Sequence, residues 1–290
     1  MKSLWNDAEA AKFGGPLGPR VYTSRLLGRD RSLVLHGGGN TSVKLDESDL
    51  FGARQEVLYV KGSGWDLETI EAAGFAPVEL DYVRRLASLP SLPDPQMINE
   101  LATHTLRADA PAPSVETILH AILPHRYVDH THADAVLSVS NSPDGEQRVR
   151  DIYGDKAVVI PYIMAGFDLA AYCAREFPRQ KTRNTVGMVL LSHGVFSFAA
   201  EARESYELMI ELVAMAERYL AAKKAWNVGL PPAIGSAFKR EEAAKLRSDA
   251  SKAAGFPLLC RCNDAPRFLG FARHPEVARI SQGGRLRPTT

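Results

Sequence analysis

The run Tyr127-Val128-Asp129-His130-Thr131-His132 constrains this chain more than any other part of its sequence. Alternate residues of a β-strand point to the same face, so a strand here would set the imidazoles of His130 and His132 side by side. A third histidine, His193, follows the apolar run 186–192, where a second strand would end before a glycine turn. Three histidines without a fourth protein ligand match the ligand set of catalytic zinc sites, which leave one position open for water or substrate.

The chain holds eight histidines, so this spacing can also arise by chance. The setting favours a metal site, because Asp129 and Asp134 flank the pair and carboxylates commonly orient metal-bound imidazoles. Glu116 lies fourteen residues before His130 and is the candidate acid or base. Of the other histidines, we interpret His36 and His120 as structural and expect His104, His125 and His274 at the surface.

Composition narrows the class of protein. The 290 residues, 45% of them hydrophobic, are enough for a substantial core. Lys plus Arg total 35 and Asp plus Glu 34, so the net charge of +1 argues against nucleic acid or a membrane surface as a partner. Three cysteines do not make a disulfide framework, and the N-terminus lacks an apolar signal segment. We therefore expect a cytoplasmic protein.

Short apolar strands alternate with helical patterns along the first three quarters of the chain. Strands are expected at 32–36, 41–45, 56–60, around His130, and at 157–160, 186–191 and 195–198, the last two as a hairpin. Helices are expected at 19–27, 80–87, 94–106, 114–123, 134–140, 146–153, 168–177 and 202–224, with a short one opening at Asp66. The order predicts an α/β protein with a layered, mixed, largely antiparallel central sheet flanked by helices.

A boundary follows the longest helical pattern. Pro231 and Pro232 interrupt the chain, and one charged helix, 238–254, comes after them. We expect a main domain at residues 1–226 and a small helical appendage at residues 227–290.

Two glycine turns follow early strands. The run Gly37-Gly38-Gly39-Asn40-Thr41-Ser42 lacks the third glycine of a dinucleotide fingerprint and precedes a strand rather than a helix, which argues against a Rossmann fold. The second turn, Lys61-Gly62-Ser63-Gly64, also combines glycines with a hydroxyl side chain, and Lys61 adds a positive charge. Both segments could be ordinary tight turns. Alternatively, their N–H and hydroxyl donors could line a pocket for a phosphate or carboxylate.

Several of these segments together resemble the class II aldolase and adducin family. The resemblance rests on residues 39–42, 62–64, 114–116, 130–132 and 193–194, which occur in the family's order and span roughly Arg20 to Leu220. Residues 35–44 and 59–67 are similar to the aldolase part of bifunctional rhamnulose-1-phosphate aldolase/alcohol dehydrogenases. At 290 residues we expect no dehydrogenase domain and no dehydrogenase activity in this chain.

The resemblance implies a zinc-dependent aldolase that cleaves a phosphorylated ketose such as rhamnulose 1-phosphate to dihydroxyacetone phosphate and lactaldehyde. His130, His132 and His193 would bind one Zn²⁺ per subunit, replaceable by another divalent metal. Glu116 would be the acid/base, with a pKa raised by burial. The phosphate pocket would be lined by Asn40, Thr41, Ser42, Ser63 and Gly64.

Alternatives remain open on the same scaffold. A sugar-phosphate epimerase or decarboxylase would share the metal and the anion pocket, and an adducin-like module would interact without catalysis. The family also implies a small phosphorylated sugar as partner and a homotetramer with sites between subunits. The tyrosine that family members use as a proton donor is not assigned, and Tyr153, Tyr162 and Tyr219 are candidates.

Overall fold

A computed structural model describes residues 1–226, 229–231 and 239–281. Its centre is a seven-stranded sheet in which only β5 and β6 run parallel, all other neighbours being antiparallel. In spatial order the strands are β3 (Phe75–Glu79), β2 (Arg54–Lys61), β1 (Asn40–Ser48), β4 (Tyr127–Thr131), β7 (Gly194–Ala199), β6 (Gly187–Leu190) and β5 (Ala157–Ile160). The predicted α/β architecture with a mixed, largely antiparallel sheet is confirmed.

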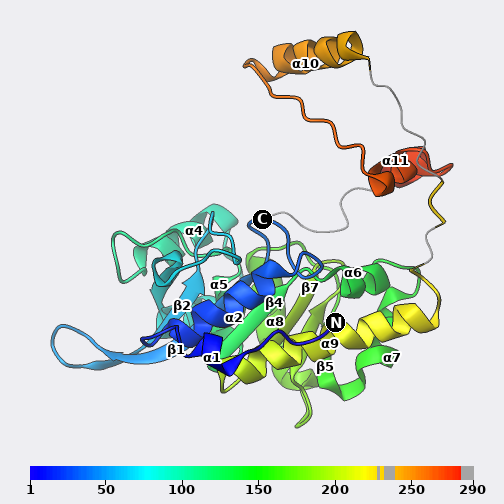
Figure 1. Cartoon of the computed structure of the whole chain (residues 1–290). Coiled ribbons are helices and arrows are strands. Elements are labelled where there is room, and N and C mark those ends of the chain that lie inside the picture. The colour runs from blue at the N-terminus through cyan, green and yellow to red at the C-terminus, as the bar shows by residue number, and fades with distance from the viewer. Residues whose placement is uncertain (227–228, 232–238, 282–290) are drawn as a thin grey trace. The chain divides into compact units, whose positions relative to one another are not determined.

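Helices cover both faces of the sheet, and α2 and α9 cross the near face in Figure 1. One core lies beneath α2 (Gly18–Arg29), α6 (Asp134–Ser140), α7 (Gly145–Tyr153) and α9 (Ala202–Ala222). The other lies beneath α3 (Leu80–Leu86), α4 (Asp94–Thr103), α5 (Thr117–Ile122) and α8 (Phe167–Gln180). The short elements are α1 (Asp7–Ala10) and the 3₁₀ turns η1 (Ala72–Gly74) and η2 (Gly154–Lys156).

Strand β4 lies at the middle of this sheet and is buried along its whole length. Val128 belongs to the core beneath α5 and α8, whereas Thr131 contacts Met209 of α9 on the opposite face. Because side chains alternate along a strand, His130 shares the face of Val128 and Asp129 shares that of Thr131. One strand therefore presents a histidine to one layer and a carboxylate to the other.

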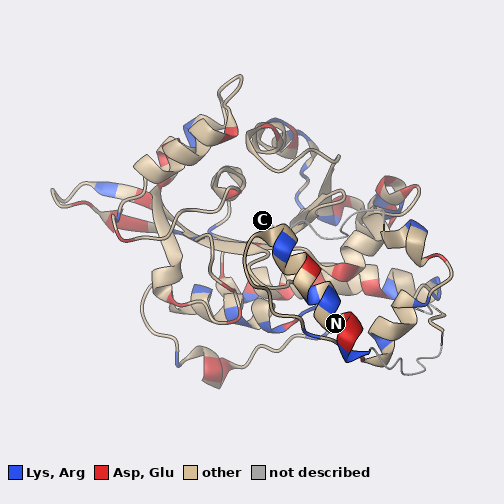
Figure 2. Cartoon of the chain, turned by 90° about the horizontal axis from the view of Figure 1, so that it is seen from above, with Lys and Arg blue, Asp and Glu red and all other residues tan. Residues whose placement is uncertain are grey.

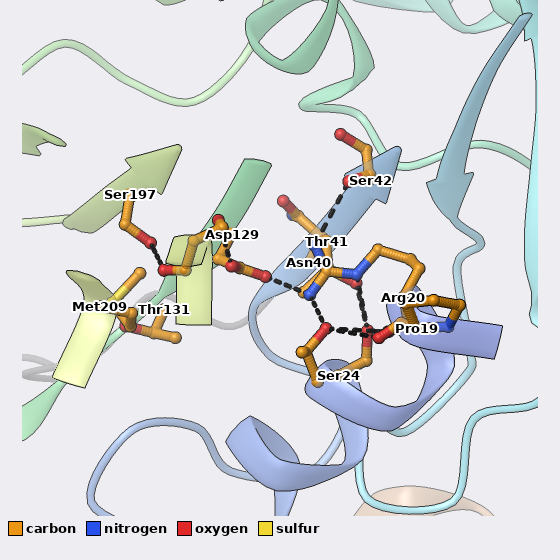
Figure 3. A network of polar contacts seen from close by, with 12 residues as sticks. Pro19, Arg20, Ser24, Asn40, Thr41, Ser42, Asp129, Thr131, Ser197 and Met209 are labelled. Atoms are coloured by element: carbon orange, nitrogen blue, oxygen red, sulfur yellow. Dashed lines mark hydrogen bonds and ion pairs between the residues drawn. The ribbon is translucent and has the colours of Figure 1, made fainter. Parts of the chain in front are cut away.

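The carboxylate of Asp129 is paired with Arg20 of α2, and neither side chain has any exposed surface. Figure 3 shows this network from close by. Arg20 also donates from Nε to Ser24 Oγ (3.3 Å) and from Nη1 to the carbonyl oxygen of Ser42 (3.3 Å). Ser205 of α9 donates to the second oxygen of Asp129 (2.5 Å). Buried charges are tolerated when they are paired and fully hydrogen-bonded, and this pair joins α2, β1, β4 and α9.

Local predictions were wrong at residues 32–36 and at Asp66. Residues 32–36 form turns instead of a strand, because the Asp30 side chain accepts hydrogen bonds from the N–H (2.9 Å) and the hydroxyl (2.6 Å) of Ser32. Leu33 and Val34 are buried, so their apolar character reflects core packing rather than strand pairing. His36, which we interpreted as structural, is exposed, with φ 51°. The segment that starts at Asp66 forms turns where a short helix was expected.

A second compact unit begins at Ala225. Its described helices are α10 (Arg240–Ala254), α11 (Pro266–Ala272) and α12 (Val277–Ser281). The predicted start of α10 at Phe238 lies outside the described residues. Figure 2 shows Lys and Arg interspersed with Asp and Glu over the described elements. None of the helices in the described ranges is long and apolar enough to cross a membrane.

Asp129→Asn should destabilise the fold by about 3–5 kcal/mol, because it leaves the buried guanidinium of Arg20 without a counter-charge. The free energy of unfolding from urea titrations measures this effect. The exposed pair of Lys12 and Glu9 provides the control, since Glu9→Gln should leave the urea midpoint unchanged. Equal midpoints for Asp129→Asn and the wild type would contradict the structural role of the pair.

Candidate metal centre

The structure brings three histidines together at one end of β4. His130 lies on β4, His132 follows that strand directly, and His193 lies in the turn between β6 and β7. β7 pairs with β4, so the turn that carries His193 comes to the end of β4 although it is distant in sequence. One nitrogen from each ring lies within 4.8 Å of the other two, and all three residues are buried.

His130 presents a bare nitrogen to the other two rings. His130 Nδ1 is 3.2 Å from the carbonyl oxygen of Val195, which can only accept, so Nδ1 carries the proton and Nε2 is unprotonated. Burial lowers the pKa of His130 to about 4, which keeps the ring neutral at pH 7. The Nε2 atoms of His130 and His132 are 3.0 Å apart. Two imidazoles on a tetrahedral Zn²⁺ have their nitrogens about 3.3 Å apart, so this donor set fits a divalent metal.

Glu116 adds a carboxylate to the cluster. Its Oε1 is 3.1 Å from His193 Nε2 and its Oε2 is 3.5 Å from His130 Nε2. Oε1 is buried and has no hydrogen bond of good geometry among the described residues. An unsatisfied buried carboxylate oxygen is costly, and a cation held by the three imidazoles would remove that cost. The orphan oxygen is therefore a second observation that fits a bound metal.

The raised pKa expected for Glu116 is not what the structure indicates. Burial by itself would raise the pKa of this carboxyl. The nearby His130 and His193 together lower it by more than burial raises it, so the pKa of Glu116 lies well below its usual value. Glu116 is thus ionised in its resting state. A carboxylate in this state accepts a proton before it can donate one.

Two glycines allow the backbone to approach the histidines. A Cβ on Gly194 would stand 2.5 Å from the carbonyl oxygen of Thr131 and 2.8 Å from Cε1 of His130. A Cβ on Gly39, where φ is +68°, would stand 2.8 Å from the carbonyl oxygen of His130. Only glycine fits at either position without displacing β4.

Asn40 and Ser114 hold Glu116 in place. Asn40 donates from Nδ2 to Glu116 Oε2 (2.5 Å) and to Ser114 Oγ (3.2 Å). Ser114 Oγ accepts a weaker hydrogen bond from the backbone N–H of Glu116 (3.3 Å). The sequence marked Ser114 as the start of a helix and as part of the family resemblance. Its contact with Asn40 joins segments that lie too far apart in the sequence for residue spacing to predict it.

The other residues expected around a phosphate lie in two environments. The hydroxyl of Thr41 contacts Ser24 Oγ (2.8 Å) and that of Ser42 contacts His120 Nδ1 (2.7 Å), and neither residue is exposed. Ser63 and Gly64 form an exposed turn after β2, with φ +83° at Gly64. Of the five residues predicted to bind phosphate, Asn40, Thr41 and Ser42 are therefore in the interior, and Ser63 and Gly64 are at the surface.

Lys61 lies between the two glycine turns. Its ammonium donates to the carbonyl oxygen of Gly37 (3.0 Å), and only 4% of the residue is exposed. Burial lowers the pKa of Lys61 to about 8, while Asp66 and Glu116 oppose that change. The sequence marked this residue only as a cation in a turn, and the structure places its ammonium against the glycine loop that precedes β1.

The tyrosines have different surroundings. Tyr153 is buried and donates to the carbonyl oxygen of Leu212 (3.0 Å), whereas Tyr162 is 57% exposed and Tyr219 is half-buried. The hydroxyl of Tyr153 is thus already engaged inside the core.

Comparison with known sequences links the chain to one family. A sequence profile of the class II aldolase and adducin N-terminal domain matches residues 20–220. The uncharacterized oxidoreductase YuxG of Bacillus subtilis (strain 168) is 36% identical over 220 residues, which are 76% of this chain and 32% of that protein. The chain thus spans about a third of the length of this curated relative.

Solved structures agree with that match. The N-terminal class II aldolase domain of a conserved protein from Thermoplasma acidophilum is 39% identical, with a TM-score of 0.69 over 76% of this chain and 99% of that one. A sugar-phosphate aldolase from Thermotoga maritima shares the fold at 15% identity, with a TM-score of 0.51 over 71% of this chain and 94% of that one.

Gly194→Ala should weaken Zn²⁺ binding about 10–100-fold, because the new methyl group forces the turn at His193 away from β4. Titration of the metal-stripped protein with Zn²⁺ by calorimetry measures this. Gly37→Ala is the matched control, since a Cβ there meets nothing within 4 Å and should leave the affinity unchanged. Wild-type affinity in Gly194→Ala would show that the cluster does not depend on this close approach.

Proposed function

Because the chain belongs to the class II aldolase and adducin family, we propose that it is a zinc-dependent aldolase. The proposed reaction cleaves rhamnulose 1-phosphate, or a similar phosphorylated ketose, to dihydroxyacetone phosphate and lactaldehyde. The observation that supports it most is the convergence of three buried histidines on an ionised carboxylate with an unsatisfied oxygen.

His130, His132 and His193 would hold the metal. When bound, Zn²⁺ would supply the Lewis acidity that polarises the ketose carbonyl. The three protein ligands leave room for the substrate, as catalytic zinc sites require. The neutral state of His130 and the hydrogen bond from its Nδ1 to Val195 keep its ring ready to bind.

Glu116 would move the proton. Its Oε2 is held by Asn40, and its Oε1 faces the histidines, where the reacting carbon of the substrate would lie. During cleavage the ionised carboxylate would take up, at Oε1, the proton that the substrate releases when its hydroxyl becomes the aldehyde carbonyl, and would deliver that proton to the carbon that becomes part of dihydroxyacetone phosphate; synthesis would reverse both transfers. The burial of Glu116 excludes bulk water from this exchange.

The phosphate would bind at the two glycine turns. Ser63 and Gly64 are exposed and could contact it directly, with Lys61 as the nearby cation. Asn40, Thr41 and Ser42 would support this pocket from the interior, since their side chains are engaged with Glu116, Ser24 and His120. We also propose a homotetramer, and a division into a main domain at 1–226 and an appendage at 227–290.

An epimerase or a decarboxylase acting on a sugar phosphate is the second candidate, because either reaction could use the same metal ligands and the same carboxylate. The histidine cluster argues against a non-catalytic, adducin-like module, which has no need of a buried acid/base beside a metal site. The longer relative is named an oxidoreductase, and this chain spans only a third of its length.

Glu116→Gln should retain stoichiometric zinc and lower kcat about 10²–10⁴-fold, because the amide cannot exchange the proton. Metal content by mass spectrometry and steady-state cleavage of rhamnulose 1-phosphate measure the two effects. Glu68→Gln, at an exposed position, is the control. Full activity in Glu116→Gln would exclude the proposed role.

A panel of ketose 1-phosphates tests the reaction itself. We expect cleavage products from at least one of them, complete loss of cleavage on removal of the metal with a chelator, and recovery on addition of Zn²⁺. Isomeric or decarboxylated products in place of dihydroxyacetone phosphate would contradict the aldolase assignment and favour the second candidate.

A further inference from the structure

A chain of buried hydrogen bonds connects β1 to Glu116 through His120. The imidazole of His120 has partners at both nitrogens: Nε2 is 2.5 Å from Asn40 Oδ1, and Nδ1 is 2.7 Å from Ser42 Oγ. The other side of the Asn40 amide reaches Glu116 Oε2 at 2.5 Å. Each of these four residues is at most 2% exposed, so the chain runs without contact with bulk solvent.

The orientation of the Asn40 amide sets the direction of every hydrogen bond. Its Nδ2 is the atom that faces Glu116 Oε2 and Ser114 Oγ. Oδ1 therefore faces His120 and can only accept, which requires a proton on Nε2. Burial holds the pKa of His120 well below its usual value, so the ring is neutral and Nδ1 is bare. Ser42 then donates its hydroxyl proton to Nδ1.

We propose that His120 is a positioning residue for Glu116, acting through the amide of Asn40. A proton on Nε2 makes Oδ1 the favoured partner of His120 and turns Nδ2 toward Glu116. With the amide reversed, Oδ1 would face Oε2, and two acceptors would repel each other in a buried site. This inference rests on the acid/base role proposed for Glu116.

Packing fixes His120 in the required place. The ammonium of Lys44 donates to three carbonyl oxygens at the end of α5, those of His120 (2.9 Å), Leu123 (2.7 Å) and His125 (2.7 Å). The His120 ring meets the edge of Phe196, with centroids 5.6 Å apart. Phe196 also stacks on His130 at 4.2 Å, so the same ring supports the positioning residue and a proposed ligand.

Two substitutions at position 120 separate positioning from packing. In His120→Gln the side-chain amide reaches the place of Nε2 and keeps a donor for Asn40, whereas in His120→Asn it reaches only the place of Nδ1 and keeps the contact with Ser42. We expect kcat to fall about 10–100-fold in His120→Asn, with KM and zinc content unchanged. His120→Gln should recover most of that loss. Equal kcat values for the two variants would overturn the proposal.

A double-substitution cycle shows whether His120 acts through Glu116. In the Glu116→Gln background, the added His120→Asn should cause no further loss of kcat, because the group that it positions is already inactive. A further loss as large as that in the wild-type background would mean that His120 acts elsewhere, and the proposal would fail.

The tautomer of His120 provides a readout independent of activity. In ¹⁵N-histidine-labelled full-length protein, we expect a protonated Nε2 and an unprotonated Nδ1 for this ring, assigned by comparison with His120→Gln. The opposite tautomer would overturn the inference even if the aldolase assay succeeds. Full activity in Glu116→Gln together with the expected tautomer would instead refute the acid/base role, so the two failures are distinguishable.

Discussion

The buried ion pair between Arg20 and Asp129 is the constraint on which the rest of this structure depends. The Asp129 side chain lies on one face of β4. Because side chains alternate between the two faces along a strand, the next residue, His130, points to the other face. A shift of β4 by one residue would exchange these faces, leaving a carboxylate among the histidines and an imidazole against the guanidinium. The network that secures the register thus also aims the first candidate metal ligand (Figure 3).

The centre on the opposite face concentrates polar groups where water is excluded. Each has a partner that limits its freedom: Val195 for His130, Asn40 for Glu116, and His120 for Asn40. Within the described part of the chain, the buried side-chain oxygen left without a hydrogen bond of good geometry is Glu116 Oε1, which lies 3.1 Å from His193 Nε2. A cation held by the three imidazoles would offset the cost of burying that oxygen, which links the stability of the site to its proposed chemistry.

The sequence predicted those features that depend on short-range periodicity. His130 and His132 share a face because strand side chains alternate, and His193 occupies a turn because glycine follows an apolar run. It predicted residues 32–36 wrongly, since an Asp30 turn satisfied the backbone locally while Leu33 and Val34 still entered the core. Glu116 was named as the candidate acid or base from its place shortly before His130, and the family resemblance implied the same role. Its contact with Asn40, the role of His120 and the interior position of Thr41 depend on pairings between distant segments, which no local pattern encodes.

The central claim is that His130, His132 and His193 form a metal centre. Anomalous X-ray diffraction from crystals of the purified protein, recorded above and below the zinc absorption edge, tests it most directly. The account predicts one strong zinc peak per chain, about 2.0–2.1 Å from a nitrogen of each of the three rings. No peak among these rings after crystals are soaked in Zn²⁺, or a peak only at other residues, would contradict it.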